Sequence, residues 1–349
     1  MSPNPLVGAV LVRAGRVIGE GHHAELGADH AEVAAIEDAR KRGAPVAGST
    51  LYVTLEPCAH HGRRPPCTDA IIRAKIARVV VASEDPSDKA SGRGPGILRD
   101  EGVAVESLYG VEAELARRLN QPFRKHARTA RPLVMLKAAM TLDGRTATAG
   151  GDAKWISGPE SRELTHHWRA EFDAICVGIG TALADDPLLT ARDVDAIRQP
   201  TRVVFDGDAR LPLDSALVGS LDEAPVVVIT RPSAPDKQVS ALERAGAEVF
   251  ACEGTGGGGV GAALDRLGRR DLTSLIVEGG GTLAGSFVDA DAVDELRIFV
   301  APLLFGGAEA RPVAAGEGVK AISEATRALA TEVERCGEDV LIRARLKEW

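Results

Sequence analysis

The sequence predicts an α/β protein that is built as two domains. Its 349 residues exceed the roughly 150 residues of a typical single domain by more than a factor of two. Apolar runs with strand character alternate with segments of helical periodicity along the chain, which is typical of an α/β layer. Between two such series lies Asn120–Pro132, a polar and basic stretch with two prolines. We therefore expect this stretch to be the linker between the domains.

The first series of elements predicts one layered domain. Leu6–Val12 is apolar and rich in β-branched residues, and Gly15 permits a turn into the short strand Val17–Ile18. Farther along, Ala31–Arg40 has the apolar spacing of an amphipathic helix. The remaining elements expected here are the strands Leu51–Leu55, Arg78–Ala82 and Val103–Leu108 and the helices Thr68–Lys75 and Val111–Leu119.

The second series predicts another α/β layer after the linker. Gly254–Gly261 is rich in glycine but lacks the spacing of a nucleotide loop, so we expect a flexible connector there, with phosphate contact as the alternative. The expected strands are Leu133–Ala138, Ala174–Gly178, Arg202–Asp206, Pro225–Thr230, Glu248–Ala251, Ser274–Glu278, Glu295–Ala301 and Val340–Leu346, and the expected helices are Pro159–Glu171, Asp236–Ala245, Gly261–Leu267 and Thr282–Asp289.

Composition and charge exclude several classes of protein. With 44% hydrophobic and 26% charged residues, the chain is not of the disordered class. A net charge of −8 disfavours nucleic-acid binding but is compatible with a small phosphate ester, which a few arginines can bind. Five cysteines, an odd number, do not indicate a disulfide framework. No apolar run reaches the roughly 18 residues of a membrane span, and no secretory signal is evident, so we expect a cytoplasmic protein without membrane contact.

One histidine and two cysteines form the strongest chemical signal in the sequence. His30 precedes Glu32 by two residues, and Cys58 and Cys67 each follow a proline. One imidazole and two thiolates suit Zn²⁺ and leave its fourth tetrahedral position for a water, as in catalytic sites. Glu32 at the start of a helix can move protons to and from that water. This is the pattern of nucleobase deaminases.

Each part of this pattern has a simpler interpretation. Asp29 and Glu32 have the spacing of a capping box, so Glu32 could serve only as a helix cap. Cys58 and Cys67 could be buried thiols, and the loop histidines His60–His61 are alternative ligands. We favour the zinc site, because all its elements occur together.

The spacing of the cysteines points to one family. Eight residues separate Cys58 from Cys67, and Pro3–Val10 and Thr54–Cys58 carry further matching motifs. Together they resemble the bifunctional riboflavin-biosynthesis deaminase/reductases, and the resemblance covers nearly the whole chain. It implies an N-terminal cytidine-deaminase-like α/β/α domain at residues 1–122, followed by a dihydrofolate-reductase-like α/β domain at residues 131–349.

The resemblance implies a definite reaction for the first domain. That reaction is the zinc-dependent hydrolytic deamination of 2,5-diamino-6-ribosylamino-4(3H)-pyrimidinone 5′-phosphate, with one zinc per chain. His30, Cys58 and Cys67 would hold the metal, and Glu32 would be the catalytic proton carrier. The implied substrate contacts are Asn4, His23 and Arg63.

Three features depart from the family pattern. The family's N-terminal helix, which packs on the deaminase sheet, is expected to be missing from this chain. Arg64 stands where the family has threonine, and Ser87 stands where it has a contacting asparagine. A reductase-only enzyme with a crippled deaminase domain is therefore the alternative function.

Glycines after a strand indicate a nucleotide site in the second domain. Val277–Leu283 follows an expected strand and opens a helix, where backbone amides can approach a pyrophosphate. A glycine cluster is weak evidence alone, and the domain's first strand lacks a Gly-x-Gly-x-x-Gly motif. Further motifs that resemble the family's reductase half are Leu136–Gly144, Trp155–Ser157, Gly178–Thr181 and Ala184–Arg192. They imply NADPH-dependent reduction of the ribosyl to the ribityl side chain.

The resemblance also assigns residues to the reductase site. Arg169 would clamp the phosphate, although a solvated helix arginine is the simpler interpretation, and Trp155 could be a core aromatic. Ala153 replaces a contacting serine, and Arg231 could reach the 2′-phosphate of NADPH, although we favour a surface role for it. The implied substrate residues are Lys137, Arg169, Leu189, Arg192 and Glu278, and the implied NADPH residues are Ala139, Trp155, Thr181, Asp185, Gly280, Gly281, Thr282 and Leu283.

The expected partner is a small phosphorylated pyrimidine, with no nucleic acid and no membrane, and we expect a homo-oligomer, either a dimer or a tetramer. Two other classes compete with this interpretation. A nucleic-acid-editing zinc deaminase is disfavoured by the net charge of −8 and by the long loop between the cysteines. A non-catalytic zinc-stabilised binding protein would show no substrate-dependent oxidation of NADPH.

Overall fold

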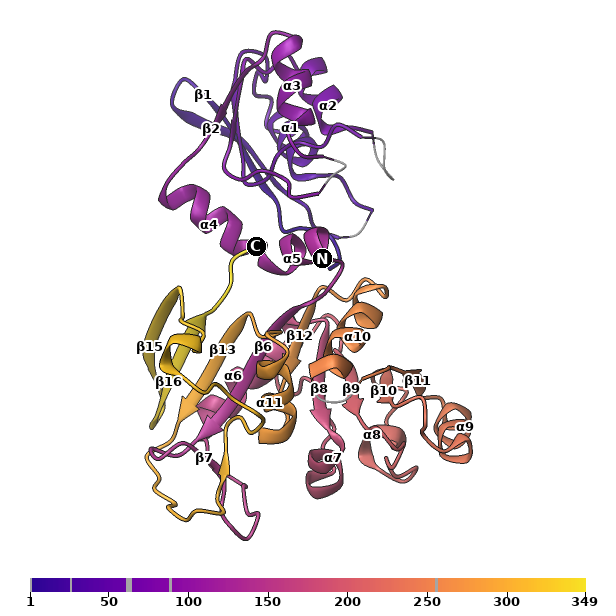
Figure 1. Ribbon diagram of the computed structural model, residues 1–349. Coiled ribbons are helices and arrows are strands. Elements are labelled where there is room, and N and C mark those ends of the chain that lie inside the picture. Colours follow the sequence, from indigo (N-terminus) through magenta and orange to yellow (C-terminus); the bar gives the residue numbers. More distant parts are fainter. Residues whose placement is uncertain (1, 26, 61–64, 88–89, 255–256) are drawn as a thin grey trace. The chain divides into compact units, whose positions relative to one another are not determined.

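The chain divides into two compact units. The computed structural model describes residues 2–25, 27–60, 65–87, 90–254 and 257–349. The first unit comprises residues 1–130 together with Trp349, and the second comprises residues 131–348. Each unit has its own sheet and its own hydrophobic core (Figure 1).

The first unit is a mixed five-stranded sheet with the strand order β2-β1-β3-β4-β5. Strand β1 pairs antiparallel with β2 and with β3, whereas β3, β4 and β5 run parallel. Its strands are β1 (Gly8–Arg13), β2 (Arg16–His22), β3 (Thr50–Val53), β4 (Arg78–Val81) and β5 (Ala104–Ser107), and its helices are α1 (Ala31–Lys41), α2 (Cys67–Arg73), α3 (Arg93–Asp100), α4 (Val111–Leu119) and α5 (Gln121–Thr129).

Two glycines of β2 bring helix α1 directly onto the sheet. A Cβ atom at Gly19 would lie 2.4 Å from the carbonyl oxygen of Ala35, and one at Gly21 would lie 2.3 Å from the amide nitrogen of Ala35. Only glycine leaves room for the helix backbone at these positions. The close packing fixes the start of α1, next to which His30 stands. Strand β2 extends to His22, beyond the short strand expected from apolar residues alone, because its residues up to His22 pair with β1.

The second unit is a nine-stranded sheet with the order β11-β10-β9-β8-β12-β6-β13-β16-β15. The strands from β11 to β13 run parallel, and β16 and β15 complete the sheet antiparallel. The nine strands are β6 (Leu133–Met140), β8 (Ala174–Gly178), β9 (Thr201–Phe205), β10 (Val226–Thr230), β11 (Glu248–Ala251), β12 (Ser274–Val277), β13 (Glu295–Val300), β15 (Ala330–Cys336) and β16 (Asp339–Arg345), and two short strands, β7 (Arg145–Ala147) and β14 (Arg311–Pro312), form a separate antiparallel pair. Its helices are α6 (Pro159–Glu171), α7 (Ile179–Asp185), α8 (Ala216–Gly219), α9 (Asp236–Ala245), α10 (Gly257–Gly268) and α11 (Gly281–Asp289), with a 3₁₀ turn at Ile322–Glu324.

Helices cover both faces of this sheet. Apolar side chains of α10 and α11, among them Leu264 and Phe287, form one core with alternate residues of the parallel strands, such as Val134 and Leu136. The residues between them point to the other face. There, Trp168 of α6 stacks on Phe299 of β13 with ring centroids 5.4 Å apart.

Two predicted loops are in fact partly helical. The boundary between the units falls within the predicted stretch Asn120–Pro132, after Ala130, but the stretch is not a solvated connector, because α5 occupies most of it and belongs to the first unit. Its basic residues Arg124 and Lys125 are buried, and Arg124 donates to the Ser83 hydroxyl at 3.2 Å and the Glu84 carbonyl at 2.9 Å. The flexible connector predicted at Gly254–Gly261 is also shorter than expected, because α10 begins at Gly257.

Candidate active sites

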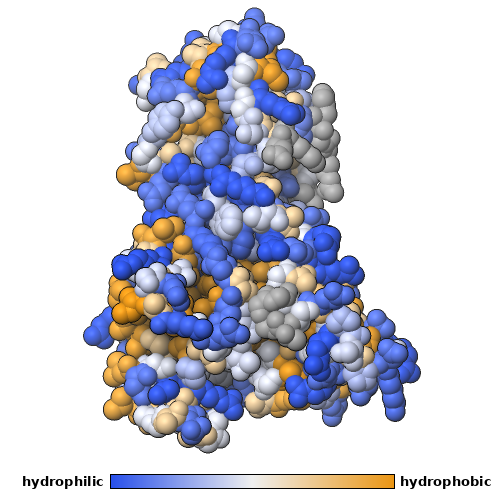
Figure 2. Space-filling view, in the orientation of Figure 1, coloured by the Kyte–Doolittle hydropathy of each residue, from blue (hydrophilic) through white to orange (hydrophobic). Residues whose placement is uncertain are grey.

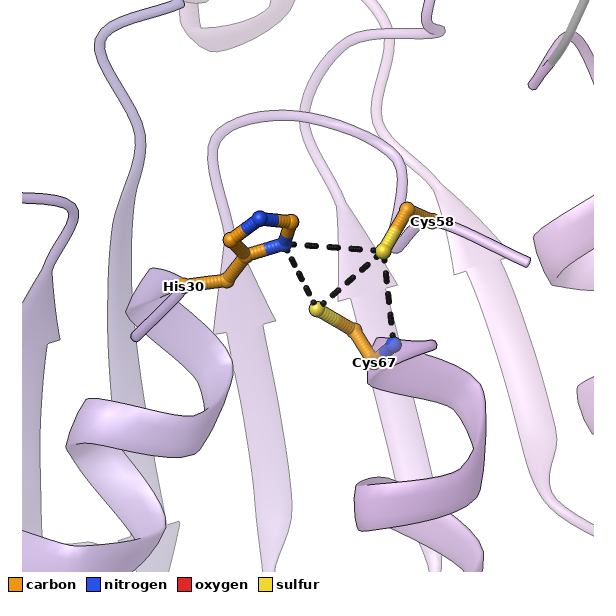
Figure 3. Close-up of side chains that lie close together, drawn as sticks. All are labelled: His30, Cys58 and Cys67. Atoms are coloured by element: carbon orange, nitrogen blue, oxygen red, sulfur yellow. Dashed lines mark hydrogen bonds between the residues drawn. The ribbon is translucent and has the colours of Figure 1, made fainter. Parts of the chain in front are cut away.

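Three potential metal ligands converge in the first unit. The Nδ1 atom of His30 lies 3.1 Å from the sulfur of Cys67 and 3.5 Å from that of Cys58, and the two sulfurs are 3.5 Å apart (Figure 3). No other cluster of three such groups with metal-binding geometry occurs within the part of the chain that the structure describes. His60 is exposed and outside this cluster, and His61 falls outside the described residues.

Three secondary-structure elements place these ligands. His30 is the residue before α1, Cys67 is the first residue of α2, and Cys58 stands in the loop after β3. The main-chain N–H of Cys67 donates to the sulfur of Cys58 at 3.3 Å, which ties the loop to the start of α2. Because two of the ligands lie at the starts of packed helices and the third is hydrogen-bonded to one of these starts, the cluster is held by the fold rather than by the loops alone.

The electrostatics of the cluster suit a divalent cation. A hydrogen bond from Cys67, together with one from His30, lowers the pKa of the Cys58 thiol to about 4. The hydrogen bond between the two sulfurs, in which Cys67 keeps its proton, raises the pKa of the Cys67 thiol, and burial and the negative charge of Glu32 raise it further. Two neighbouring sulfurs therefore share one proton here, and a dication would displace it and bind both as thiolates. The donor set thus fits zinc with a fourth position left for water.

Glu32 lies in the first turn of α1, beside this cluster. Its side chain is only 3% exposed. Burial raises the pKa of its carboxyl from 4.5 to about 7, against the opposing effect of a backbone hydrogen bond. The side chain of His30, the residue before α1, makes no capping hydrogen bond to the helix. A buried carboxyl with a near-neutral pKa can both accept and release a proton, which favours the catalytic interpretation over the cap.

Asn4 and His23, two of the predicted substrate contacts, contact each other. The Nδ1 atom of His23 lies 3.1 Å from the carbonyl oxygen of Asp29, so Nδ1–H is the donor there. Nε2 is then the acceptor for the amide N–H of Asn4 at 2.8 Å. The His23 ring also meets the His30 ring edge-on at a centroid distance of 5.2 Å. The structure therefore joins both residues to the metal cluster, whereas Arg63 falls outside the described residues.

A buried amide side chain holds the segment that carries Asn4. The main-chain N–H of Leu6 donates to Oδ1 of Asn120 at 2.7 Å, and Nδ2 of Asn120 donates to the Leu6 carbonyl at 2.8 Å. Asn120 thus pairs with Leu6 as a neighbouring strand would. We call such a pair of hydrogen bonds, from one side-chain amide to the N–H and C=O groups of one residue, an amide clamp. Gln121 forms a second amide clamp with the main chain of Trp349, at 2.9 and 3.2 Å.

A buried ion cluster marks the second unit. Arg169 of α6 donates from Nε and one terminal nitrogen to both oxygens of Glu278, at 2.9 and 2.8 Å. The ammonium of Lys137 on β6 lies 3.9 Å from the same carboxylate. Burial alone would raise the pKa of Glu278, but the charges of Arg169 and Lys137 outweigh it and hold that pKa at about 2. Sequence reasoning predicted all three residues, but not that two of the three guanidinium nitrogens of Arg169 bond to Glu278.

Arg192 and Leu189 join this cluster through Thr190. The carbonyl of buried Thr190 accepts from Arg169 at 3.3 Å, and its hydroxyl accepts from Arg192 at 3.1 Å. Leu189 has a φ of 57°, a left-handed conformation that costs free energy for a side chain other than glycine. A third amide clamp fixes the segment: Gln199 pairs with both main-chain groups of Ala191 at 2.7 and 2.9 Å.

The predicted nucleotide residues gather at the carboxyl ends of β8 and β12. These strands are parallel neighbours, so the helices that follow them begin side by side. The N–H of Gly280 donates to the hydroxyl of Thr181 in α7 at 3.2 Å. A Cβ atom at Gly281 would lie 2.6 Å from the carbonyl oxygen of Pro312, so no side chain fits there. Gly281 thus lets the main chain at Pro312 pack closely on the start of α11, which includes Thr282 and Leu283 and whose first N–H groups are of the kind that binds a pyrophosphate.

The other predicted cofactor residues lie around this surface. Trp155 is 70% exposed, which excludes its interpretation as a core aromatic. The guanidinium of Arg162 lies 4.8 Å from the centroid of the Trp155 ring. Lys154 pairs with the Asp185 carboxylate at 3.1 Å. Ala139 stands two residues after Lys137 on β6 and therefore shares its face of the sheet. Arg231, the alternative 2′-phosphate residue, forms an ion pair with Asp208.

Sequence reasoning missed several residues that hold these sites in place. Asn120, Gln199 and His166 bond to segments that carry predicted site residues, and His166 accepts the main-chain N–H of Arg192 at 3.1 Å. No local pattern marks such residues, because each bonds to a backbone group 8 to 114 positions away along the chain. Only the fold reveals them.

Comparisons with known proteins agree with both sites. Residues 1–83 match the cytidine and deoxycytidylate deaminase zinc-binding region, and residues 132–342 match the RibD C-terminal domain. The riboflavin biosynthesis protein RibD of Aquifex aeolicus (strain VF5) is 41% identical over 341 residues, covering 97% of this chain and 92% of that protein. The corresponding protein of Escherichia coli (strain K12) is 37% identical over 352 residues, covering 97% and 93%.

Solved structures show the same two-part architecture. RibD of Acinetobacter baumannii (form 1) superposes with a TM-score of 0.85 at 35% identity, covering 99% of this chain and 93% of that chain. The diaminohydroxyphosphoribosylaminopyrimidine deaminase/5-amino-6-(5-phosphoribosylamino)uracil reductase of Thermotoga maritima gives a TM-score of 0.85 at 36% identity, with the same coverage.

The class of protein follows from these matches and from the geometry. It is a two-domain enzyme in which a zinc-binding deaminase domain precedes an NADPH-dependent pyrimidine reductase domain. The chain belongs to the RibD family, the bifunctional deaminase–reductases of riboflavin biosynthesis. The predicted fold class, the two activities and the two cofactors are thereby confirmed.

A search for membrane-spanning segments gave a negative result. Among the residues that the structure describes, no helix is sufficiently long and apolar to cross a bilayer.

Proposed function

We propose that the first unit hydrolyses the 2-amino group of 2,5-diamino-6-ribosylamino-4(3H)-pyrimidinone 5′-phosphate. The convergence of His30, Cys58 and Cys67 beside buried Glu32 is the observation that carries this proposal. The activities by which the Thermotoga maritima relative is named indicate the substrate class. The net charge of −8 further supports a small-molecule substrate rather than a nucleic acid.

Glu32 moves the protons of the deamination. When bound, zinc lowers the pKa of a water and makes it nucleophilic near neutral pH. Glu32 takes the two protons of the attacking water in turn and delivers one to the adjacent ring nitrogen and one to the 2-amino nitrogen, so that the C–N bond breaks, ammonia leaves and the ring carbon becomes a carbonyl. Its pKa of about 7 suits both transfers. We assign Asn4, His23 and Arg63 to the recognition of the pyrimidine.

In the second unit we propose that NADPH reduces the ribosyl chain of the deaminated product. C1′ of the open-chain imine accepts the hydride, and its nitrogen accepts a proton. We assign that proton to Lys137, because burial lowers the pKa of its ammonium. Arg192 would bind the phosphate, aided by Arg169. The remaining assignments are Leu189 and Glu278 to the substrate and Ala139, Trp155, Thr181, Asp185, Gly280, Gly281, Thr282 and Leu283 to NADPH.

Metal analysis tests the deaminase proposal. The purified protein is expected to contain about one zinc per chain. Cys58→Ser should lose most of that zinc and its ammonia release from the diaminopyrimidine substrate, because a neutral hydroxyl replaces a thiolate ligand. Substrate-dependent NADPH oxidation should survive. The matched control is Cys336→Ser on β15, which should retain zinc and both activities. A Cys58→Ser protein that still deaminates would refute the proposal.

We also propose that the chain forms a homo-oligomer, either a dimer or a tetramer. Strand β15 is an edge strand of the large sheet, and nearly all its residues are exposed. Apolar surface gathers over the region where Figure 1 draws β13, β15 and β16 (Figure 2). Exposed strand edges and apolar patches favour pairing with a second copy. Sedimentation should give at least twice the 36.5 kDa of one chain, whereas a monomer at micromolar concentration would contradict this.

The five cysteines, all unpaired, support our further proposal that the enzyme works in the reducing cytoplasm.

A further inference from the structure

His166 lies among the charged groups of the reductase site without belonging to the residues assigned to it. It stands on α6, one turn before Arg169. Its Nδ1 atom accepts the main-chain N–H of Arg192 at 3.1 Å. This bond links α6 to the segment that carries Leu189 and Arg192, next to the residue that Gln199 clamps.

The bond requires one particular state of the imidazole. Nδ1 can accept a hydrogen bond only when it carries no proton, so the ring must be neutral with its proton on Nε2. The positively charged ring would present N–H groups at both positions. Protonation of His166 would therefore replace an attraction to the Arg192 main chain with a repulsion.

The surroundings of His166 favour the neutral ring. Arg169 on the same helix and Arg192 on the segment after α7 both face it, and Glu278 after β12 is the opposing negative charge. Burial, followed by the charges of the two arginines, lowers the pKa of the imidazole below 6.5. The charge of Glu278 and a hydrogen bond with the Thr190 main chain act in the opposite direction but do not outweigh these effects.

We propose that His166 is a positioning residue of the reductase, which holds Arg192 in place for the substrate phosphate by accepting its main-chain N–H. The inference rests on the proposed role of Arg192 in phosphate binding. Substrate affinity then depends on the protonation state of His166, a residue that touches neither substrate nor cofactor. As the pH falls, the ring becomes charged, the bond to Arg192 is lost and KM for the phosphorylated substrate rises.

Two variants separate the effect of losing the hydrogen-bond acceptor at position 166 from the effect of a positive charge there. His166→Asn retains an oxygen near the position of Nδ1 but cannot be protonated, and His166→Leu removes the acceptor while keeping an apolar side chain. Loss of one such bond should raise KM of His166→Leu about threefold to tenfold at about pH 8, with kcat little changed. His166→Asn should stay close to wild type there. The neighbouring exposed residue His167 provides the matched control, His167→Asn.

The pH profile is the decisive readout. Between about pH 8 and pH 5.5 the ratio of wild-type KM to His166→Asn KM should rise, since only the wild type loses its acceptor. Titration of the substrate phosphate affects both proteins equally and cancels in the ratio. A ratio that falls with decreasing pH would show that charged His166 attracts the phosphate. An unchanged KM in His166→Leu would show that the hydrogen bond to Arg192 does not affect substrate binding. Either result overturns the proposal.

Nuclear magnetic resonance of the imidazole nitrogens provides a readout that does not depend on turnover. The free enzyme should show an unprotonated Nδ1 and a pKa below 6.5 for His166. Protonation of Nδ1 at neutral pH would overturn the positioning role directly. If the wild-type enzyme did not reduce the phosphorylated substrate at all, the proposed function would fail, and this spectrum would still decide whether His166 holds Arg192.

Discussion

Replacing Glu32 with glutamine is expected to lower kcat for deamination by a factor of about 10² to 10⁴, the range that general acid–base catalysis supplies. Glutamine keeps the size of the side chain and its ability to accept a hydrogen bond, but it cannot carry a proton between water and the leaving nitrogen. Zinc content should stay near that of the wild type, because Glu32 is not a ligand. Ammonia release, measured alongside metal content, checks this result.

The control for this variant lies on the same helix. Glu37 is exposed and pairs with Arg40, so Glu37→Gln should leave deamination intact. NADPH oxidation with the deaminated substrate should be unaffected in both variants. If Glu32→Gln deaminated at the wild-type rate, Glu32 would be a helix cap and another group would carry the proton.

The Glu278→Gln variant is expected to destabilise the second unit by about 3–5 kcal/mol, because it leaves the buried cations Arg169 and Lys137 without their common counter-charge. The same change should abolish most of the reductase activity. Urea unfolding followed by the fluorescence of buried Trp168, which lies on α6 one residue from Arg169, measures the loss. The exposed Glu163→Gln on the same helix provides the control and should change stability by less than about 0.5 kcal/mol.

The pH dependence of stability provides a second test of the Glu278 cluster. Because the pKa of Glu278 in the folded chain is about 2, below its ordinary 4.5, its ion pairs contribute fully above the ordinary value. That contribution disappears as the pH falls from about 4.5 toward 2. The Glu278→Gln variant should lack this part of the acid dependence. Equal stability of variant and wild type at neutral pH would show that the charges are compensated elsewhere.

Local patterns predicted the elements whose signals are complete within the chain segment. Helix α6 and strand β8 have the predicted bounds, since Pro159 starts the helix and an uninterrupted apolar run forms the strand. Helix α3 was missed, because Gly94 and Pro95 within it oppose helix formation in isolation. Strand β15 was missed as well. It is exposed nearly throughout, so its pairing with β16 and not a buried pattern makes it a strand.

The features of the candidate sites likewise fall into those that the sequence displays and those that only the fold reveals. The zinc ligands follow from spacing and residue type, which the sequence displays directly. The pairing of Arg169 with Glu278 joins residues 109 positions apart, and only the sheet order reveals it. The burial of Arg124 in a stretch that reads as a solvated linker is likewise a tertiary effect, because its partners Ser83 and Glu84 lie about 40 positions upstream.

The three amide clamps have a consequence for the chemical ageing of the enzyme. Each clamp needs an oxygen on one side of the amide and an N–H on the other, as with Asn120 against Leu6 and Gln199 against Ala191. Spontaneous hydrolysis of the amide to an acid exchanges that N–H for an oxygen and sets a negative charge against a carbonyl. A single slow hydrolysis during storage would thus loosen the segment next to Asn4 or Arg192. The molecule would lose substrate affinity while every helix and strand remained intact.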